Sequence, residues 1–144
     1  MSNLAGITPE LSERQRAVLD LPLNRHLGIV FDGIVNGTAH AHFYATPAVA
    51  TFGGQAHGGA LISLCEVTGF LALLPLLDDK HHAVTHDLHM SLMRAVPAGA
   101  RCDLSGSVAR LGRSLAFIEV RAEVEGKLVA SARITKSIIA RTDL

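Results

Sequence analysis

Residues 53–69 read GGQAHGGALISLCEVTG, and they open the most apolar run of the chain, which continues to residue 77. A helix that is apolar on every side is typical of a buried core helix. The run also raises a membrane span as an alternative, because spanning takes about 20 apolar residues. Glu66 near its middle, Pro75 near its end and the lack of basic flanks argue against a span. We therefore expect a core helix and no membrane partner.

The chain has 144 residues, and its 13 basic residues balance its 13 acidic ones. This length suits a single domain, expected over residues 1–144, with a peripheral helix and lead-in over residues 1–25. Zero net charge provides no overall field that favours nucleic acid, so no nucleic-acid partner is expected. Two cysteines are too few for a disulfide framework, and the chain shows no signal-peptide pattern. A reducing cytoplasm is the expected location.

The segments on either side of the apolar run have the composition of strands. Residues 26–46 hold two of them, separated by Asn36-Gly37, a dipeptide that favours a tight hairpin turn. Four more follow the helix, at residues 82–96, 101–111, 114–125 and 127–140. Their short connections predict antiparallel neighbours. We therefore predict an α+β fold in which one curved antiparallel sheet wraps around a long central helix.

A short amphipathic helix is predicted ahead of the sheet, in the stretch TPELSERQRAVLD. Thr8 is the expected N-cap and Pro9 the first helical position. The third helical position holds Leu11 rather than an acid or amide, so no capping box is expected.

Strict alternation divides the predicted strands into two faces. It leaves open which face of the segment after the helix points inward. The groups are Ala39, Ala41, Phe43 and Ala45 opposite Thr38, His40, His42 and Tyr44; Thr85, Asp87, His89 and Ser91 opposite Val84, His86, Leu88, Met90 and Leu92; and Ala116, Ile118, Val120, Ala122 and Val124 on the buried face of a later strand.

Glu66 is a carboxylate in the middle of the apolar helix. A buried carboxylate without a partner is strongly disfavoured, and it escapes by pairing, by taking up a proton or by facing a cavity. No Lys or Arg lies at helical spacing from Glu66. The sequence therefore favours a carboxylate that faces a cleft. A hydrogen bond to Ser63 or to a distant arginine is the alternative.

Gly58-Gly59 opens the same helix. The first turn of a helix carries free N–H groups and the positive end of the dipole, and glycine lets a ligand approach the backbone closely. This suits a carbonyl oxygen that becomes negative during reaction. The alternative is a tight turn into the helix and nothing more. Gly58 and Glu66 lie about 12 Å apart along one helix, so a shared substrate requires two chains and predicts a dimer with two composite sites.

Three phrases of the sequence, HGGALISLCEVTG, VTHDLHMSLMRAVPAG and GRSLAFIEVRAEVEGKLVASARITK, resemble the hotdog-fold acyl-CoA thioesterases of the phenylacetate-pathway and 4-hydroxybenzoyl-CoA thioesterase type. The resemblance covers about residues 26–140. It implies a hotdog fold, a homodimer that often assembles further into a homotetramer, and hydrolysis of an acyl-CoA at the dimer interface without a cofactor. A small aromatic or a short- or medium-chain acyl group is the expected substrate. A non-catalytic acyl-CoA-binding or sensing protein on the same fold is the alternative.

The resemblance also implies roles for individual residues. The Gly58 N–H would polarise the thioester carbonyl, and Glu66 of the partner chain would act as nucleophile or general base. Thr51 stands where many relatives have Asn, and Gln55 is a nearby alternative donor. Thr85 stands about where relatives place Ser or Thr near the attacking water.

The positions of other polar residues in the sequence suggest roles for them. His57 is expected to orient the loop before the helix. Gly59, Arg110, Arg113, Ser114 and Lys136 are the candidate groups for the substrate and the coenzyme A phosphates. Cys65 is expected to be a small buried hydrophobe rather than a nucleophile. No metal site is expected, because His86 and His89 point to opposite strand faces and the pair His40 and His42 has no third ligand.

Overall fold

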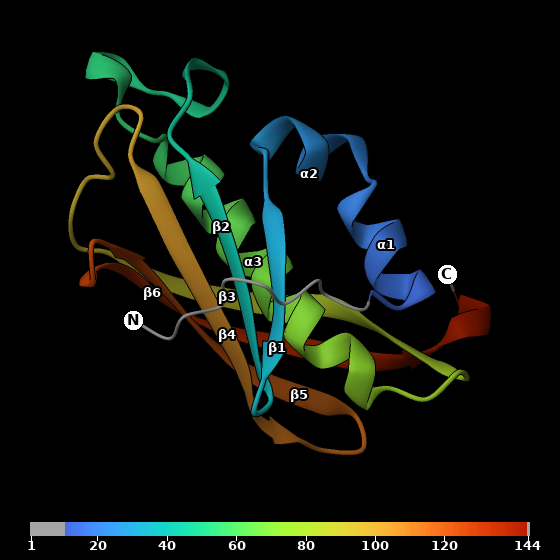
Figure 1. Cartoon of the computed structure of the whole chain (residues 1–144). Helices are drawn as coiled ribbons and strands as arrows, with labels where there is room; N and C mark the ends of the chain where they lie inside the picture. The colour runs from blue at the N-terminus through green and yellow to red at the C-terminus, as the bar shows by residue number, and fades with distance from the viewer. Residues whose placement is uncertain (1–10, 144) are drawn as a thin grey trace.

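The computed structural model describes residues 11–143, and over these residues a six-stranded antiparallel sheet covers one long helix (Figure 1). The sheet order is β1-β2-β4-β5-β6-β3. The helices are α1 (Glu13–Leu19), α2 (Pro22–Leu27) and α3 (Gly58–Leu73), and the strands are β1 (Val30–Val35), β2 (Thr38–Tyr44), β3 (His81–Leu92), β4 (Arg101–Leu111), β5 (Leu115–Val124) and β6 (Lys127–Ala140). Short 3-10 turns lie at η1 (Pro47–Val49), η2 (Phe52–Gly54), η3 (Leu74–Leu76) and η4 (Arg141–Asp143). The predicted hotdog architecture is confirmed.

Two tight turns set the hairpins of the sheet. Asn36 and Gly37 both have positive φ angles, 50° and 78°, between β1 and β2, and Glu125 and Gly126 have 50° and 76° between β5 and β6. Positive φ at both central residues matches the right-handed twist of the flanking strands. The hairpin predicted at Asn36-Gly37 is therefore confirmed.

The inner face of the sheet packs tightly on α3. Gly69 is a point of close approach between helix and sheet, because a Cβ there would lie 3.1 Å from Ile118 Cγ2 and from Ile134 Cδ1. A Cβ on Gly106 would lie 3.2 Å from the carbonyl oxygen of Thr68. The predicted inward residues of two strands are buried, namely Ala39, Ala41, Phe43 and Ala45, and Ala116, Ile118, Val120 and Ala122. Two positions depart from the prediction: Val124 is only partly buried, and His42 on the opposite face of β2 is buried as well.

The N-terminal region differs from its prediction. Helix α1 begins at Glu13, and Ser12 with Gln15 forms a capping box: the Gln15 N–H donates to Ser12 Oγ (3.1 Å) and the Ser12 N–H to Gln15 Oε1 (3.0 Å). The expectation of no capping box was wrong, because the helix begins later than assumed. The predicted cap residues Thr8 and Pro9 lie outside the described residues.

Helix α2 extends through His26 and Leu27, where the first strand was expected to begin. Pro22 stands at its first position and Gly28, at φ 73°, ends it in the left-handed conformation. Both are ordinary helix-boundary residues. The first strand therefore begins at Val30 rather than near His26.

Strand β3 lies at the edge of the sheet and pairs with β6, the last strand, rather than with β4. The prediction that strands joined by a short connection are neighbours was wrong for this pair. Strand β3 ends at Leu92, and the connecting segment runs past the start of α3, where the Ala56 N–H donates to the Val96 carbonyl (3.0 Å). This crossing leaves β4 in the middle of the sheet.

One helix among the described residues is long and apolar enough to cross a membrane, the 19-residue stretch Gly58–Leu76 that joins α3 to η3. In this fold the stretch is the core helix, and the sheet covers much of it.

Candidate active site

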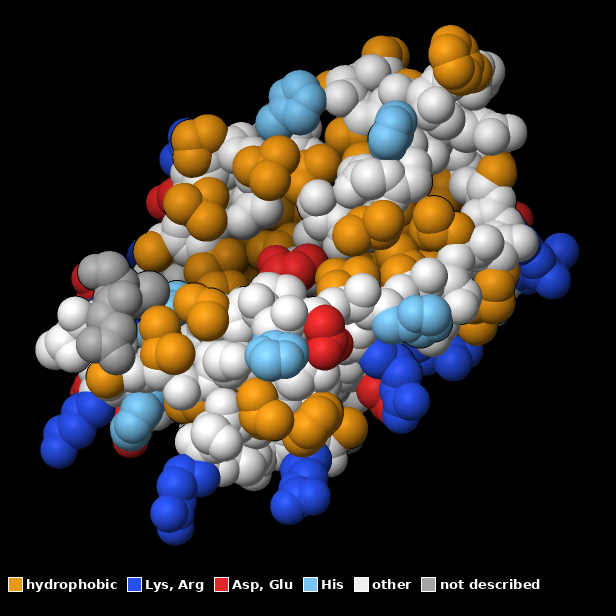
Figure 2. Space-filling model, turned by 180° about the vertical axis from the view of Figure 1, so that it is seen from behind, with side chains coloured by type: hydrophobic (Ala, Val, Ile, Leu, Met, Phe, Trp, Pro, Cys, Tyr) orange, Lys and Arg blue, Asp and Glu red, His pale blue; other side chains and the backbone are white. Residues whose placement is uncertain are grey.

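A narrow stripe of α3 is left uncovered by the sheet. Gly59 and Ile62 are exposed, and the Glu66 side chain, one turn further along, keeps 29% of its surface. These positions are three or four residues apart and share one side of the helix. Figure 2 shows a face of the molecule on which hydrophobic side chains surround a hollow with acidic atoms at its floor. The expectation of a helix covered on nearly every side therefore holds except along this stripe.

The Glu66 carboxylate has two partners, both bound to its Oε1 atom. The Thr85 hydroxyl of β3 donates to Oε1 at 2.7 Å, and the Lys136 ammonium of β6 also donates to Oε1. Lys136 donates in addition to Thr85 Oγ1 at 2.9 Å. The sequence showed no lysine or arginine at helical spacing and left a distant arginine open as a partner. The partner is instead a lysine 70 residues away, which helical spacing cannot detect. Ser63, the other alternative partner considered from the sequence, donates to the Gly59 carbonyl instead (3.1 Å).

Lys136 was expected to meet phosphates near a strand end, and this expectation is corrected. Its side chain is only 2% exposed. It occupies an inward position of β6, between Ile134 and Ile138, and its ammonium lies 4.3 Å from the centre of the Phe70 ring. A group so deeply buried cannot reach a phosphate in solvent. The sequence indicated this burial in one way: Lys136 falls at an inward position of a strand whose residues alternate between two faces.

A bulge in β3 brings Thr85 into the cluster. Thr85 pairs with Lys136 and Asp87 pairs with Thr135, so His86 is the extra residue. Ala83 is buried before the bulge, and Leu88 and Met90 pack on the core after it. The predicted strict alternation was wrong, because the bulge exchanges the inward and outward positions of the strand.

The start of α3 forms a second cluster, made mainly of backbone groups. The Gly59 N–H donates to His57 Nδ1 at 2.8 Å, so the imidazole caps the helix. A Cβ on Gly59 would lie 3.1 Å from that nitrogen, which explains the glycine. His57 thus has the orienting contact expected of it. Gly59, expected to contact the substrate, has its N–H occupied by His57.

Gly58 keeps a free donor. Its N–H has no acceptor among the described residues, and the side chain nearest to it is Leu92, whose Cδ1 would lie 3.1 Å from an added Cβ. The first-turn N–H groups of a helix favour negative charge. This free donor suits a developing oxyanion, and the oxyanion role of Gly58 stays a prediction.

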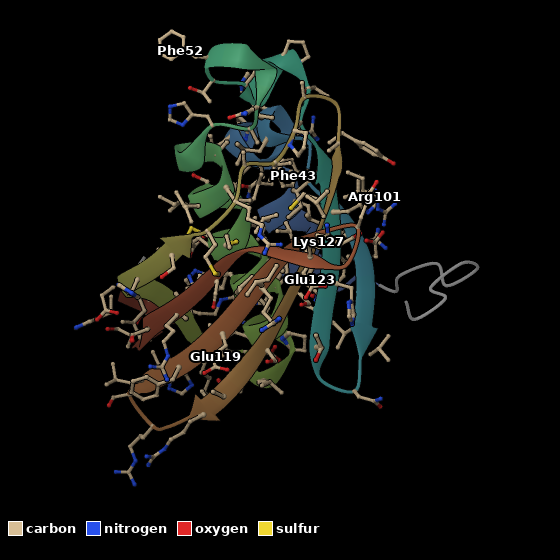
Figure 3. The ribbon with its side chains drawn as sticks, turned by 90° about the vertical axis from the view of Figure 1, so that its left-hand side faces the viewer. Phe43, Phe52, Arg101, Glu119, Glu123 and Lys127 are labelled. Atoms are coloured by element: carbon tan, nitrogen blue, oxygen red, sulfur yellow. The ribbon has the colours of Figure 1, made fainter. Side chains whose placement is uncertain are left out.

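The loop before α3 is held by its own backbone. The Thr51 N–H donates to the Gln55 carbonyl (2.7 Å) and the Gly54 N–H to the Thr51 carbonyl (3.1 Å). The Thr51 and Gln55 side chains are exposed and make no hydrogen bond among the described residues. Phe52 stands at the tip, 97% exposed, and points away from the body of the protein (Figure 3). Both predicted supporting groups therefore lie at the start of the helix, apart from Glu66.

The remaining candidates for the coenzyme A phosphates lie away from Glu66 of the same chain. Arg110 pairs with Phe117, whose exposed ring is on the outer face of the sheet, opposite α3. Arg113 and Ser114 are exposed in the turn between β4 and β5. Their role stays a prediction, and within one chain they do not join the carboxylate cluster.

The cysteines do not provide a nucleophile. Burial, and next the neighbouring Cys102, raise the pKa of Cys65 to about 12. Burial, and next Asp103, raise the pKa of Cys102 to about 12 as well. Both thiols therefore stay protonated at neutral pH, and the thiolate is the reactive form. Over residues 11–143, no three His, Cys, Asp or Glu side chains come together in a way that could hold a metal ion.

The fold corresponds to a known class, and the chain belongs to the thioesterase superfamily. The model of that family matches residues 53–131, a span that contains the start of α3, Glu66 and Thr85.

The chain is also similar to particular proteins. A Deinococcus radiodurans protein that carries a provisional esterase name is 38% identical over 87 residues, which are 59% of this chain and 57% of that protein. The chain thus spans little more than half the length of this relative. A mutant thioesterase from Pseudomonas aeruginosa has the same fold, with a TM-score of 0.83 at 23% identity over 94% of this chain and 97% of that one. A mutant phenylacetic acid degradation protein PaaI from Thermus thermophilus is similar at 28% identity, with a TM-score of 0.73 over 81% of this chain and 97% of that one.

Proposed function

We propose that the protein is an acyl-CoA thioesterase that hydrolyses a small aromatic or a short- or medium-chain acyl-CoA to the free acid and coenzyme A. One observation carries the proposal: α3 bears a free N–H donor at Gly58 and a half-exposed carboxylate at Glu66. Acyl transfer requires these two functions, oxyanion stabilisation and a nucleophile or general base. Membership of the thioesterase superfamily supports the reaction class. One domain over residues 1–144, acting in the cytoplasm, is part of the proposal.

The proposed site is shared by two chains. Gly58 and Glu66 lie about 12 Å apart along one helix, too far to act on one carbonyl. Strand β3 supports a dimer, since this 12-residue strand pairs with β6 on one side and lies at the sheet edge on the other. Long unpaired edges are templates for pairing with another chain. A two-fold axis beside β3 would place the start of one α3 near the middle of the other, and two such dimers would form the proposed homotetramer.

In the proposed reaction, the Gly58 N–H of one chain donates to the thioester carbonyl oxygen. Glu66 of the other chain takes a proton from water, whose oxygen attacks the carbonyl carbon. The tetrahedral intermediate then collapses with cleavage of the C–S bond, and the leaving thiolate takes up the proton. Direct attack by the carboxylate is the second route, through an acyl anhydride that water then hydrolyses. Thr51, Gln55 and His57 would support the donor end of the site, and Thr85 the carboxylate end.

The surroundings of the two clusters suit an apolar acyl group. Ile62 and Leu92 are exposed hydrophobic residues, and Phe70 is half-buried beside Glu66's partner Lys136. Apolar walls with few polar groups are the usual lining of small-molecule sites. Arg110, Arg113 and Ser114 are proposed to meet the coenzyme A phosphates of a site on another chain.

The direct test measures free thiol release from a panel of aromatic and aliphatic acyl-CoA substrates. Glu66→Gln should lower kcat by about 10³-fold while the protein keeps its fold and oligomeric state. The matched control is Glu119→Gln on the outer face of β5, near the Arg133 guanidinium (3.7 Å; Figure 3). Full activity of Glu66→Gln would refute the mechanism. Tight binding of acyl-CoA that is recovered unhydrolysed would favour the alternative, a non-catalytic acyl-CoA-binding or sensing protein.

A complementation experiment tests whether the site is composite. Glu66→Gln and Gly58→Pro should each be inactive as pure proteins. After the two are dissociated and mixed, half of the dimers contain one of each, and each of these has one intact site. Activity should recover to about a quarter of the wild-type value. No recovery, despite exchange of subunits confirmed by mass spectrometry, would show that both groups act within one chain.

A further inference from the structure

Lys136 is a buried cation whose ammonium contacts the carboxylate cluster. Its ammonium donates to Glu66 Oε1 and to Thr85 Oγ1, and it lies over the Phe70 ring. Its stem runs among the inward residues of β6. A buried ion pair is weak evidence for stability, because apolar residues of similar volume are often as stable or more so. The pair therefore calls for an explanation other than stability.

The two donors distinguish the two oxygens of Glu66. Oε1 accepts from both Thr85 and Lys136, whereas Oε2 accepts no hydrogen bond among the described residues. The side chain keeps 29% of its surface, on the uncovered stripe of α3. Rotation of the carboxylate would break both bonds to Oε1. The cluster thus anchors one oxygen and leaves the other free.

We propose that Lys136 is a positioning residue for the reaction: with Thr85 it holds Glu66 through Oε1, so that Oε2 is the atom that reacts. This inference rests on the proposed function and adds to it the atom that acts and the group that orients it. In the base-assisted route the proton of water passes to Oε2. In the nucleophilic route Oε2 forms the bond to the carbonyl carbon, the C–S bond breaks, and the coenzyme A thiolate leaves. Neither route draws a proton from Lys136, whose buried ammonium contacts Glu66 Oε1 and the Phe70 ring.

A positioning role differs from two others that a lysine could have. A lysine that binds the coenzyme A phosphates would change KM, and a lysine that only fills the core would affect stability without acting on kcat. Misplacement of a reacting group lowers kcat. The separation of kcat from KM is therefore the readout.

The kinetic test uses Lys136→Met, which keeps the length and apolar stem of the side chain and removes the charge. Its kcat should fall by about 10²-fold, with KM for the best acyl-CoA changed less than about threefold. Lys136→Ala should recover part of its kcat in propylammonium, which can supply the missing ammonium, and not in propanol. The matched control is Lys127→Met, at the exposed start of β6, which should behave as the wild type (Figure 3).

A second measurement needs no substrate. Thermal unfolding of Lys136→Met, Glu66→Gln and the double variant forms a double-mutant cycle. The double variant should lose less than the sum of the two single losses, because one change removes the partner of the other. Should Lys136→Met not fold, Lys136→Gln replaces it in both measurements, since the amide keeps a donor without the charge.

The outcomes separate this inference from the proposed function. A wild-type protein that hydrolyses no acyl-CoA refutes the proposed function. If the wild-type protein hydrolyses acyl-CoA and Lys136→Met keeps the full kcat, or only its KM is raised, then the positioning role alone is refuted. Additive losses in the cycle would refute the pairing itself.

Discussion

The start and the middle of α3 carry different kinds of chemistry on the same helix. At the start, the functional groups are backbone N–H donors and an imidazole cap, all within residues 57–59. At the middle, a carboxylate is held by a hydroxyl and an ammonium from two strands. Backbone donors need no counter-charge, whereas a charge in the core must be paired. The first cluster therefore forms from a short stretch of sequence, and the second forms only when the sheet closes over the helix.

A large loss of activity is expected when the backbone donor at the start of the helix is removed. Gly58→Pro removes one N–H at the first helical position, where proline is well accepted, and the preceding His57 has an extended conformation (φ −65°, ψ 135°) that suits a residue before proline. Loss of one oxyanion donor should lower kcat by about 10²–10³-fold. Gly58→Ala, which keeps the N–H and meets the same Leu92 side chain, should retain most of the activity. Equal loss in the two variants would assign the effect to bulk at residue 58 rather than to the donor.

For the free energy of unfolding, substitutions at the middle of the helix should have a larger effect than substitutions at its start. Glu66→Leu leaves the ammonium of Lys136, only 2% exposed, with Thr85 as its one remaining hydrogen-bond partner. We expect a loss of about 3–5 kcal/mol in the free energy of unfolding, measured by urea titration. Lys136→Met should cost less, because the half-exposed Glu66 can regain water. A loss in Lys136→Met larger than in Glu66→Leu would contradict this asymmetry.

The His57 cap at the start of the helix should contribute less to the free energy of unfolding than the ion pair at Glu66. His57→Ala removes the acceptor of the Gly59 N–H, and we expect a cost of about 1 kcal/mol. His57→Asn should restore most of this stability, because asparagine is a preferred N-cap. A thermal melt of both variants checks the difference. Equal melting temperatures for His57→Ala and the wild type would show that the cap contributes nothing.

The smallest effect concerns His82, which borders the carboxylate cluster. Burial, and next the positive charges of Arg14, Lys136 and Arg141, lower the pKa of His82 below its ordinary value. Below a pH of about 6.5 the unfolded chain therefore binds the proton more readily than the folded one, and the folded state loses stability as the pH falls. His82→Gln should reduce this loss between pH 7 and pH 5, measured by urea titration. An unchanged pH dependence would assign the loss to other groups.

The extent to which the site could be predicted follows from how far apart its members lie. The sequence indicated Gly58, His57 and Glu66, because helix periodicity and the His-Gly-Gly stretch are local signals. It misassigned Lys136, which stands 70 residues from Glu66 and looks like any charge near a strand end. It left the orientation of Thr85 open, because the bulge at His86 shifts the alternation of β3. A capping box at Ser12 was overlooked by placing the helix start too early.

The sequence by itself determined the apolar helix, the hairpin turn at Asn36-Gly37 and the buried faces of β2 and β5. Each depends on the conformational preferences and periodicity of neighbouring residues. Only the tertiary structure decided that β3 pairs with β6, and that Lys136 and Thr85 meet the same oxygen of Glu66. Pairing of a buried charge depends on distances in space between residues remote along the chain. The folded sheet, and not the spacing of residues along the helix, therefore orients the carboxylate.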